Sequence, residues 1–201
     1  MKALLTHKVG MTSIIGEDGN VTPVTILSAR DNIVIGKRTL EKDGYSAVIV
    51  GADEATKISK SRQGILKQSQ AKSKIIREFR TIDDTVNVGD HLGVDIFSIG
   101  DKVSVSGISK GKGWAGTIKR HGFHRGRKTH GGRSYRRVGS IGSMYPQHIL
   151  KGKKMSGRYG AAKVSTKGLK IAYVDSDNSV LGIVGAVPGP NKGLVVIKEQ
   201  K

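Results

Sequence analysis

The sequence predicts a mainly β protein: a small closed antiparallel β-barrel, a minor α+β excursion and a long irregular basic extension. Short β-branched and aliphatic runs separated by turn residues occupy both ends of the 201-residue chain. Apolar periodicity stops between about residues 107 and 160, where glycine and basic residues dominate. Aromatic residues are few, at 4%, and 28 glycines favour a turn-rich fold over an enzyme built round a deep pocket.

The first strands form a predicted hairpin. Val21–Leu27 follows Glu17-Asp18-Gly19-Asn20, and Asp-Gly is a strong signal for a tight turn. Ile14 and Ile15 lie on the other arm of this hairpin. Pro23 places its strand at a sheet edge or near a strand start, because proline lacks the N–H that a central ladder needs.

The region that follows is predicted to hold a second hairpin and the α+β excursion. A turn at Asp43-Gly44 precedes the apolar run Tyr45–Val50, and Asn32–Gly36 is its expected partner strand. The excursion covers about residues 53–80, of which 53–75 are polar and fit either a helix or an irregular segment. Periodicity does not decide whether its apolar residues belong to a helix face or a short strand; they are Ile75, Ile76 and Phe79.

Strands resume on both sides of the basic region. Leu92–Ile96 follows a glycine turn, and Asp101–Val105 alternates as a half-buried strand does. Leu169–Val174, Val180–Val184 and Leu194–Lys198 follow the basic region and are separated by turns. The simplest architecture is one small barrel closed by both ends of the chain. We therefore divide the chain into 1–106, the first part of the barrel, 107–160, the basic extension, and 161–201, the closing strands.

The positive charge belongs to one segment. Residues 102–174 contain 18 of the 35 Lys and Arg residues and none of the 16 Asp and Glu residues. Such a field favours a polyanion partner over an acidic protein or an anionic membrane. Membrane-surface binding usually needs a basic amphipathic helix, and the 14 glycines from Gly107 to Gly168 argue against a long helix there.

The basic extension cannot bury enough apolar surface to offset its ordering entropy, and its like charges repel. We expect a structured polyanion to order it. Rings interleaved with the cations can stack on unpaired bases, which favours folded RNA over duplex DNA. Candidate rRNA-binding residues are Lys110, Lys112, Trp114, Lys119, Arg120, His121, His124, Arg125, Arg127, Lys128, His130, Arg133, Arg136, Arg137, Lys151, Lys153, Lys154 and Arg158.

Motifs of enzymes and cofactor sites are weak or absent. Gly111–Gly116 matches G-x-G-x-x-G, but no acidic residue follows about 20 positions later, as a dinucleotide site requires. His121, His124 and His130 lack the Cys or nearby carboxylate that would complete a zinc site. We expect no catalytic residue, no metal, no cofactor, no small-molecule substrate and no membrane contact. The absence of cysteine and of any long apolar run fits a soluble intracellular protein.

Several long blocks of sequence resemble the large-subunit ribosomal protein L-three family in its bacterial form. The resemblance runs nearly end to end, and these blocks together are far more specific than the G-x-G-x-x-G within one of them. They are Lys8–Thr12, Asp43–Tyr45, Ser109–Arg120, Thr129–Gly131, Gly139–Gly142, Lys151–Gly157 and Gly185–Gly189.

The resemblance implies a barrel of translation-protein type, and a structural, non-enzymatic role in the cytoplasmic ribosome. It implies binding to 23S-type rRNA near its 3′ end, nucleation of subunit assembly, and proteins L-fourteen and L-nineteen as neighbours. By position, the tip near the peptidyl transferase centre is about Val138–Ile149, with Ser140, Ile141, Gly142, Ser143, Met144 and Tyr145. Some bacterial members have a methylated Gln after Gly-Ser-Ile-Gly; Ser143 stands there, so this modification is not expected.

Two other function classes stay open at this stage. An architectural DNA-binding protein would also be basic, but the sequence has no repeated or dimeric groove-reading element. An RNA-modifying enzyme with a basic recruitment segment would need a cofactor site and catalytic residues, for which the sequence gives no support.

Overall fold

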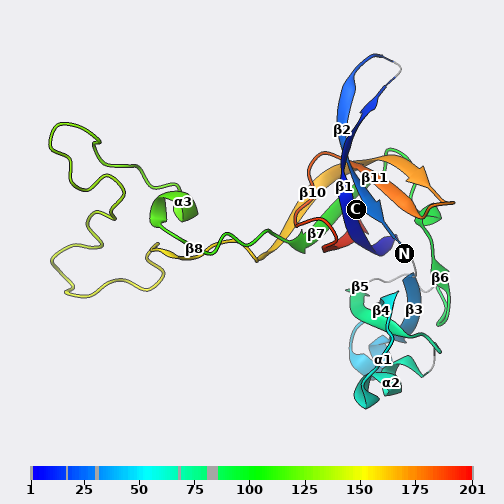
Figure 1. Ribbon diagram of the computed structural model, residues 1–201. Helices are drawn as coiled ribbons and strands as arrows, with labels where there is room; N and C mark the ends of the chain where they lie inside the picture. Colours follow the sequence, from blue (N-terminus) through cyan, green and yellow to red (C-terminus); the bar gives the residue numbers. More distant parts are fainter. Residues whose placement is uncertain (1, 17, 30–31, 68, 81–85, 201) are drawn as a thin grey trace. The chain divides into compact units, whose positions relative to one another are not determined.

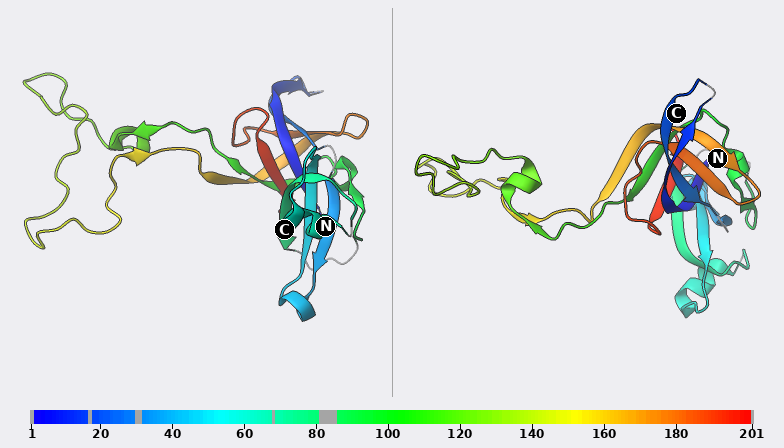
Figure 2. Two further views of the ribbon diagram at one scale, coloured as in Figure 1. Left: turned by 60° about the horizontal axis from the view of Figure 1, so that its bottom comes forward. Right: turned by 45° about the horizontal axis from the view of Figure 1, so that its top comes forward.

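A computed structural model describes residues 2–16, 18–29, 32–67, 69–80 and 86–200, and the chain divides into two compact units. The first, here called the strand unit, comprises Met1–Ser109 and Lys163–Lys201. The second, here called the basic unit, is Lys110–Ala162. Figure 1 shows sheets in the strand unit, whereas Figure 2 shows mainly loop in the basic unit. The prediction of a mainly β protein is confirmed.

Six antiparallel strands of the strand unit pair in the closed order β1-β12-β7-β10-β11-β2, in which β2 pairs back with β1. Both ends of the chain meet here, because Ala3 of β1 lies opposite Lys198 of β12. We call this the six-strand sheet. Its strands are β1 (Ala3–Ile15), β2 (Val21–Ser28), β7 (Lys102–Ile108), β10 (Lys163–Asp175), β11 (Val180–Val184) and β12 (Leu194–Glu199).

A second sheet of four strands, in the order β5-β4-β3-β6, completes the strand unit together with short helices. Gly44, in the left-handed conformation at φ 76°, ends α1 and leads the chain into β4. The elements are β3 (Asn32–Arg38), α1 (Leu40–Asp43), β4 (Ala47–Glu54), α2 (Lys60–Leu66), β5 (Ser73–Arg80), β6 (His91–Leu92) and the 3₁₀ turn η1 (Val94–Ile96).

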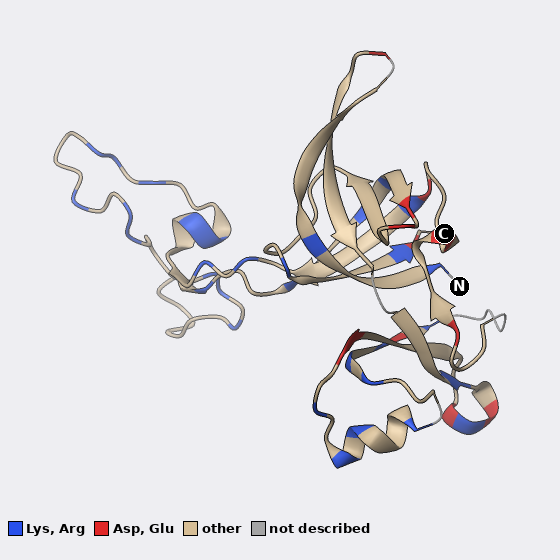
Figure 3. Cartoon of the chain, turned by 45° about the vertical axis from the view of Figure 1, so that its right-hand side comes forward, with Lys and Arg blue, Asp and Glu red and all other residues tan. Residues whose placement is uncertain are grey.

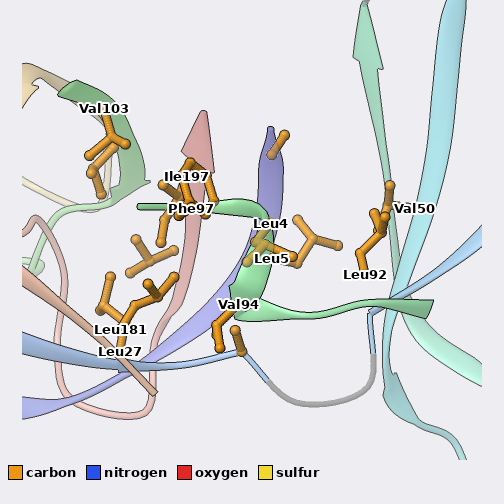
Figure 4. Packing of buried hydrophobic residues seen from close by; sticks show 14 of the residues in the cluster. Leu4, Leu5, Leu27, Val50, Leu92, Val94, Phe97, Val103, Leu181 and Ile197 are labelled. Carbon is orange, nitrogen blue, oxygen red and sulfur yellow. The ribbon is translucent and has the colours of Figure 1, made fainter. Parts of the chain in front are cut away.

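One hydrophobic core joins the two sheets. Leu4 and Leu5 of β1 are both buried and belong to the same cluster as Val50 of the second sheet and Ile197 of β12 (Figure 4). The buried Asn32 side chain adds a polar connection, because it donates to and accepts from the backbone of Leu5. A smaller cluster of Ile35, Leu66 and Ala71 packs α2 against the second sheet. No helix among the described residues has the length and apolar character to cross a membrane.

The predicted hairpin is confirmed, since Ile15 pairs with Val21 around the expected turn. The predicted pairing of residues 32–36 with the strand after Gly44 is also confirmed. The ambiguity over Phe79 is resolved as a strand, β5, where its ring is buried. The expected strand over Leu92–Ile96 is wrong: β6 ends at Leu92, and η1 follows because the chain turns there to bury Val94 and Phe97.

The boundaries of the basic region also differ from the sequence pattern. β10 begins at Lys163, six residues before Leu169, and its exposed first residues are paired through the backbone with β7. Backbone pairing leaves no trace in hydrophobic periodicity, so this part of the strand has no signal in the sequence. The division of the chain falls at Lys110 and Ala162, whereas the predicted extension was 107–160.

Candidate nucleic-acid interface

The basic unit presents an exposed surface of one sign of charge. It contains 14 of the chain's 35 Lys and Arg residues and no Asp or Glu. Every one of these cations is exposed except Arg120, which is half-buried. Figure 3 shows the basic unit with blue residues along its loops and no red ones. The positive field is therefore not neutralised by carboxylates of the unit itself, and a polyanion is the complementary partner.

Two short strands join the ends of the basic unit. β8 (Trp114–Ala115) pairs with β9 (Gly157–Arg158), so that Trp114 lies opposite Arg158. Backbone bonds extend this ribbon: the Lys112 N–H donates to the Tyr159 carbonyl, and the Tyr159 N–H donates to the Gly113 carbonyl, both at 2.9 Å. The ribbon fixes the start and end of the intervening loop close to each other.

A short helix, α3 (Thr117–His121), follows the ribbon and holds the returning chain. Arg120 donates through Nη1 to the Met155 carbonyl at 2.9 Å, and the His121 ring lies 3.1 Å from the same oxygen through Nε2. A Cβ at Gly157 would lie 2.6 Å from the Arg120 Nη1, so a larger residue there would displace the guanidinium from this contact. Arg120 and His121 therefore organise the unit from within, in addition to any part they have in binding.

The loop from His124 to Lys154 is held by few contacts of its own. Arg125 donates to the Tyr135 hydroxyl at 2.8 Å and lies over that ring, and the Gly126 N–H donates to the Tyr135 carbonyl at 3.0 Å. The predicted tip lies within this loop, and residues 138–149 are all exposed. Inside it, Ser140 donates to the Gly142 carbonyl at 2.8 Å. The tip is thus a surface segment without a core.

Trp114 lies at an open pocket in the base of the unit. Its side chain is 75% exposed. The pocket, of about 380 Å³, is lined by Gly111, Gly113, Trp114, Arg158, Tyr159, Gly160 and Ala161. Its volume is within the range of about 300–1,000 Å³ typical of small-ligand sites. Gly111 and Gly113 leave the backbone open, whereas Gly160 packs against the Lys110 carbonyl. Lys112 lies 4.8 Å from the centre of the Tyr159 ring. An aromatic face, a guanidinium and open backbone suit a planar anionic ligand such as a nucleotide.

The structure gathers the predicted residues into two sets. Lys110, Lys112, Trp114 and Arg158 lie at the ribbon, whereas the other candidates lie on α3 or along the loop and do not converge on one point. The residues predicted from the sequence do not include Tyr135, Tyr159 and Met155, which contact Arg125, Lys112 and Arg120 respectively. The two tyrosines were detectable as rings among cations, but a backbone carbonyl such as that of Met155 has no sequence signal. No cluster of metal-binding side chains occurs in the described residues.

Comparisons with known proteins agree on one family. The family described as Ribosomal protein L3 matches residues 53–182. The chain is 44% identical over 201 residues to the large ribosomal subunit protein uL3 of Geobacillus sp. (strain WCH70), covering 98% of this chain and 95% of the relative. It is 43% identical over 202 residues to uL3 of Carboxydothermus hydrogenoformans (strain ATCC BAA-161 / DSM 6008 / Z-2901), with 98% and 97% covered. The chain therefore belongs to the ribosomal protein L3 family.

Proposed function

We propose that the basic unit is an rRNA-penetrating extension, and that the chain binds 23S-type rRNA near its 3′ end early in subunit assembly. Membership of the family makes the chain a structural constituent of the large ribosomal subunit in the cytoplasm, and not an enzyme. The observation that carries the proposal is a surface of 14 cations, all but Arg120 exposed, without a carboxylate. Folded RNA supplies both the negative charge and the packing surface that this segment lacks.

The contacts divide by chemistry. Arg side chains along the loop suit two-pronged contacts with phosphate, and Lys side chains suit point contacts. We propose that Trp114 stacks on an unpaired base at its pocket, with Arg158 and Lys112 meeting the adjoining phosphates. Arg120 and His121 keep the loop ends together through Met155, which orients the remaining cations toward the RNA.

The tip has a composition unlike the rest of the unit. Cations stop at Arg137 and resume at Lys151, so that the segment Val138–Ile149 has no Lys or Arg. The basic flanks on either side can bind phosphates and hold the base of this segment. The tip between them has no Lys or Arg, which suits a segment that reaches into the interior of folded RNA. We propose that this end lies near the peptidyl transferase centre. Because Ser143 is not Gln, we expect it unmethylated.

The strand unit carries the remaining part of the proposal. We propose that the six-strand sheet is a barrel of the translation-protein type, supported by its closed strand order. Its α+β excursion is the second sheet with α1 and α2, which begins at β3 and not at the expected residue 53. The strand unit, 1–109 and 163–201, then supplies the barrel and its excursion. The basic unit, 110–162, supplies the extension in place of the expected 107–160, because Gly107 and Ile108 are paired within β7. Proteins L-fourteen and L-nineteen are the proposed neighbours, and we propose no membrane or small-molecule partner.

Salt dependence of binding to isolated large-subunit rRNA tests the central proposal. If about half of the 14 cations meet phosphates, the slope of log affinity against log salt is about −5 to −6. Replacing Arg127, Lys128, Arg133 and Arg136 with Gln makes this slope shallower by about 1.5–3. The matched control replaces four exposed lysines of the strand unit with Gln and leaves the slope unchanged; these are Lys57, Lys60, Lys67 and Lys74. A wild-type slope shallower than about −3, or equal effects of both variants, contradicts the proposal.

A further inference from the structure

The hairpin of β1 and β2 continues beyond the six-strand sheet. Pairing of β1 with β12 ends at His7, and pairing of β2 with β11 begins at Val24. Pairing between β1 and β2 nevertheless runs on to Ile15 opposite Val21. Figure 1 shows this two-stranded ribbon extending from the sheet. Among the described residues, no third strand pairs with 10–15 or 21–23. At the base of the ribbon the Pro23 carbonyl accepts a hydrogen bond from the Gly185 N–H at 2.8 Å, and beyond it both outer edges are open in the part of the chain that the structure describes.

One face of this ribbon is apolar and uncovered. Cross-strand pairing puts Met11, Ser13 and Ile15 on the same face as Val21 and Pro23. Met11 is 53% exposed, Ile15 72% and Val21 63%. The same face of β2 continues to Thr25 and Leu27, which are buried within the sheet. The face that packs the core thus continues outward over the ribbon, where no residue that the structure describes covers it. We call it the hairpin face.

The charge of this region is opposite to that of the basic unit. No Lys, Arg or His lies between Lys8 and Arg30, and the ionisable residues there are Glu17 and Asp18. In Figure 3 the ribbon is tan with red at its end. Phosphates would be repelled by these carboxylates and would find no cation on the ribbon. RNA is therefore an unsuitable occupant of the hairpin face.

Exposed β-edges and apolar patches are usually covered in the working assembly, because they otherwise favour aggregation. A two-stranded ribbon is also only marginally stable in water without a packing partner. The partner that matches this surface has an apolar strip for the hairpin face and basic side chains for the acidic end. We propose that the hairpin face binds a second, basic protein of the large subunit, rather than rRNA. This inference concerns the strand unit and does not depend on the proposed RNA contacts of the basic unit.

Photocrosslinking in assembled large subunits tests the proposal. Benzoylphenylalanine replaces Ile15 or Val21 on the hairpin face, and in the matched controls it replaces Thr22 on the opposite face or the exposed Ile65 of α2. We expect both face positions to crosslink to a protein with basic residues next to the crosslinked site, at a yield at least fivefold above both controls. Crosslinks to rRNA, to an acidic protein segment, or at no more than control yield would overturn the proposal.

A charge substitution gives the second arm of the test. Val21→Lys should reduce the salt-resistant occupancy of the crosslinked protein in washed subunits by at least half, whereas Val21→Leu should leave it unchanged. Circular dichroism of the free variants should match that of the wild type, and their affinity for isolated rRNA should be unchanged. Unchanged occupancy in Val21→Lys would contradict the inference. Lost rRNA affinity in Val21→Lys would also contradict it, because the ribbon would then be part of the RNA interface.

Discussion

The strand unit buries Leu4, Val105 and Ile197 almost completely, whereas the basic unit, all of whose residues are described, buries one hydrophobic side chain, that of Ala115. The strand unit nearly balances its charges, with 21 Lys and Arg against all 16 Asp and Glu of the chain; the basic unit has cations alone. Apolar burial can thus stabilise the first, but the second must gain its order from a partner. Stability and RNA affinity should therefore respond to different substitutions.

The largest effect is expected from a charge in the core of the strand unit. Val195 is fully buried in β12, and its carbonyl accepts a hydrogen bond from Thr6. Val195→Asp should lower the free energy of unfolding by about 4 kcal/mol or more, because it puts a carboxylate in a fully buried position of the core. Urea denaturation followed by circular dichroism measures this loss. Ile108→Asp, at an exposed position of β7, should lower the free energy of unfolding by less than about 1 kcal/mol. Equal losses of unfolding free energy in the two variants would contradict the assignment of Val195 to the core.

The next effect belongs to the basic unit and should leave stability unchanged. Trp114→Ala removes the proposed base-stacking ring, which is worth about 1–3 kcal/mol of RNA affinity per base. Filter binding to isolated rRNA should show an affinity loss of about 5- to 150-fold, with unfolding free energy within about 0.5 kcal/mol of wild type. Trp114→Phe should retain most of the affinity. Tyr173→Ala, which removes an exposed ring of the strand unit, should not alter binding.

Deleting the tip, Val138–Ile149, separates the stability of the strand unit from the function of the basic unit. These residues are exposed, so the deletion should change the free energy of unfolding of the free protein by less than about 0.5 kcal/mol. Subunits should still assemble, but peptide transfer in purified subunits should be slow if the tip lies near the peptidyl transferase centre. A protein melted by the deletion would show that the loop supports the strand unit. Normal peptide transfer would contradict the proposed position of the tip.

The smallest expected effect is an acid-dependent one at the start of the six-strand sheet. The pKa of Asp101 lies below its ordinary value, because Lys2 donates a hydrogen bond to it at 2.7 Å and the Ser98 N–H donates another. A carboxyl with a lowered pKa contributes stability above its ordinary pKa and loses that contribution as pH falls through the lowered one. Lys2→Ala should therefore slightly lower the melting temperature at pH 6 and lower it by less at pH 2. An equal difference in melting temperature between wild type and Lys2→Ala at both pH values would show that Lys2 acts through packing and not through its ion pair with Asp101.

Part of this structure follows from local chemistry in the sequence. The turn at Asp18-Gly19 fixes the hairpin, and the alternation in Asp101–Val105 marks β7. The start of β1 gave no such pattern, since Ala3, Leu4 and Leu5 are buried in succession where the first strand packs into the shared core. A strand buried on both faces loses its alternation, so periodicity does not distinguish it from other apolar runs.

The candidate interface was predictable by charge but not by geometry. Absence of acid identifies the cations of the basic unit from the sequence alone. Trp114 pairs with Arg158 through backbone groups on both sides, and the Arg120 guanidinium donates to the backbone carbonyl of Met155. Both contacts join residues far apart in the chain, and each depends on a backbone group that every residue has. Composition therefore predicts the partner, while the positions of the side chains depend on long-range pairing that composition does not contain.

Amide hydrogen exchange on the free and rRNA-bound protein tests most directly the claim that one unit is ordered by its core and the other by RNA. In the free protein, β7, β12 and the part of β10 after Leu169 should exchange slowly, and residues 124–154 should exchange fast. Binding to large-subunit rRNA should slow exchange in 124–154 and change little in the strand unit. Slow exchange throughout 124–154 in the free protein, or no slowing on binding, would contradict the account.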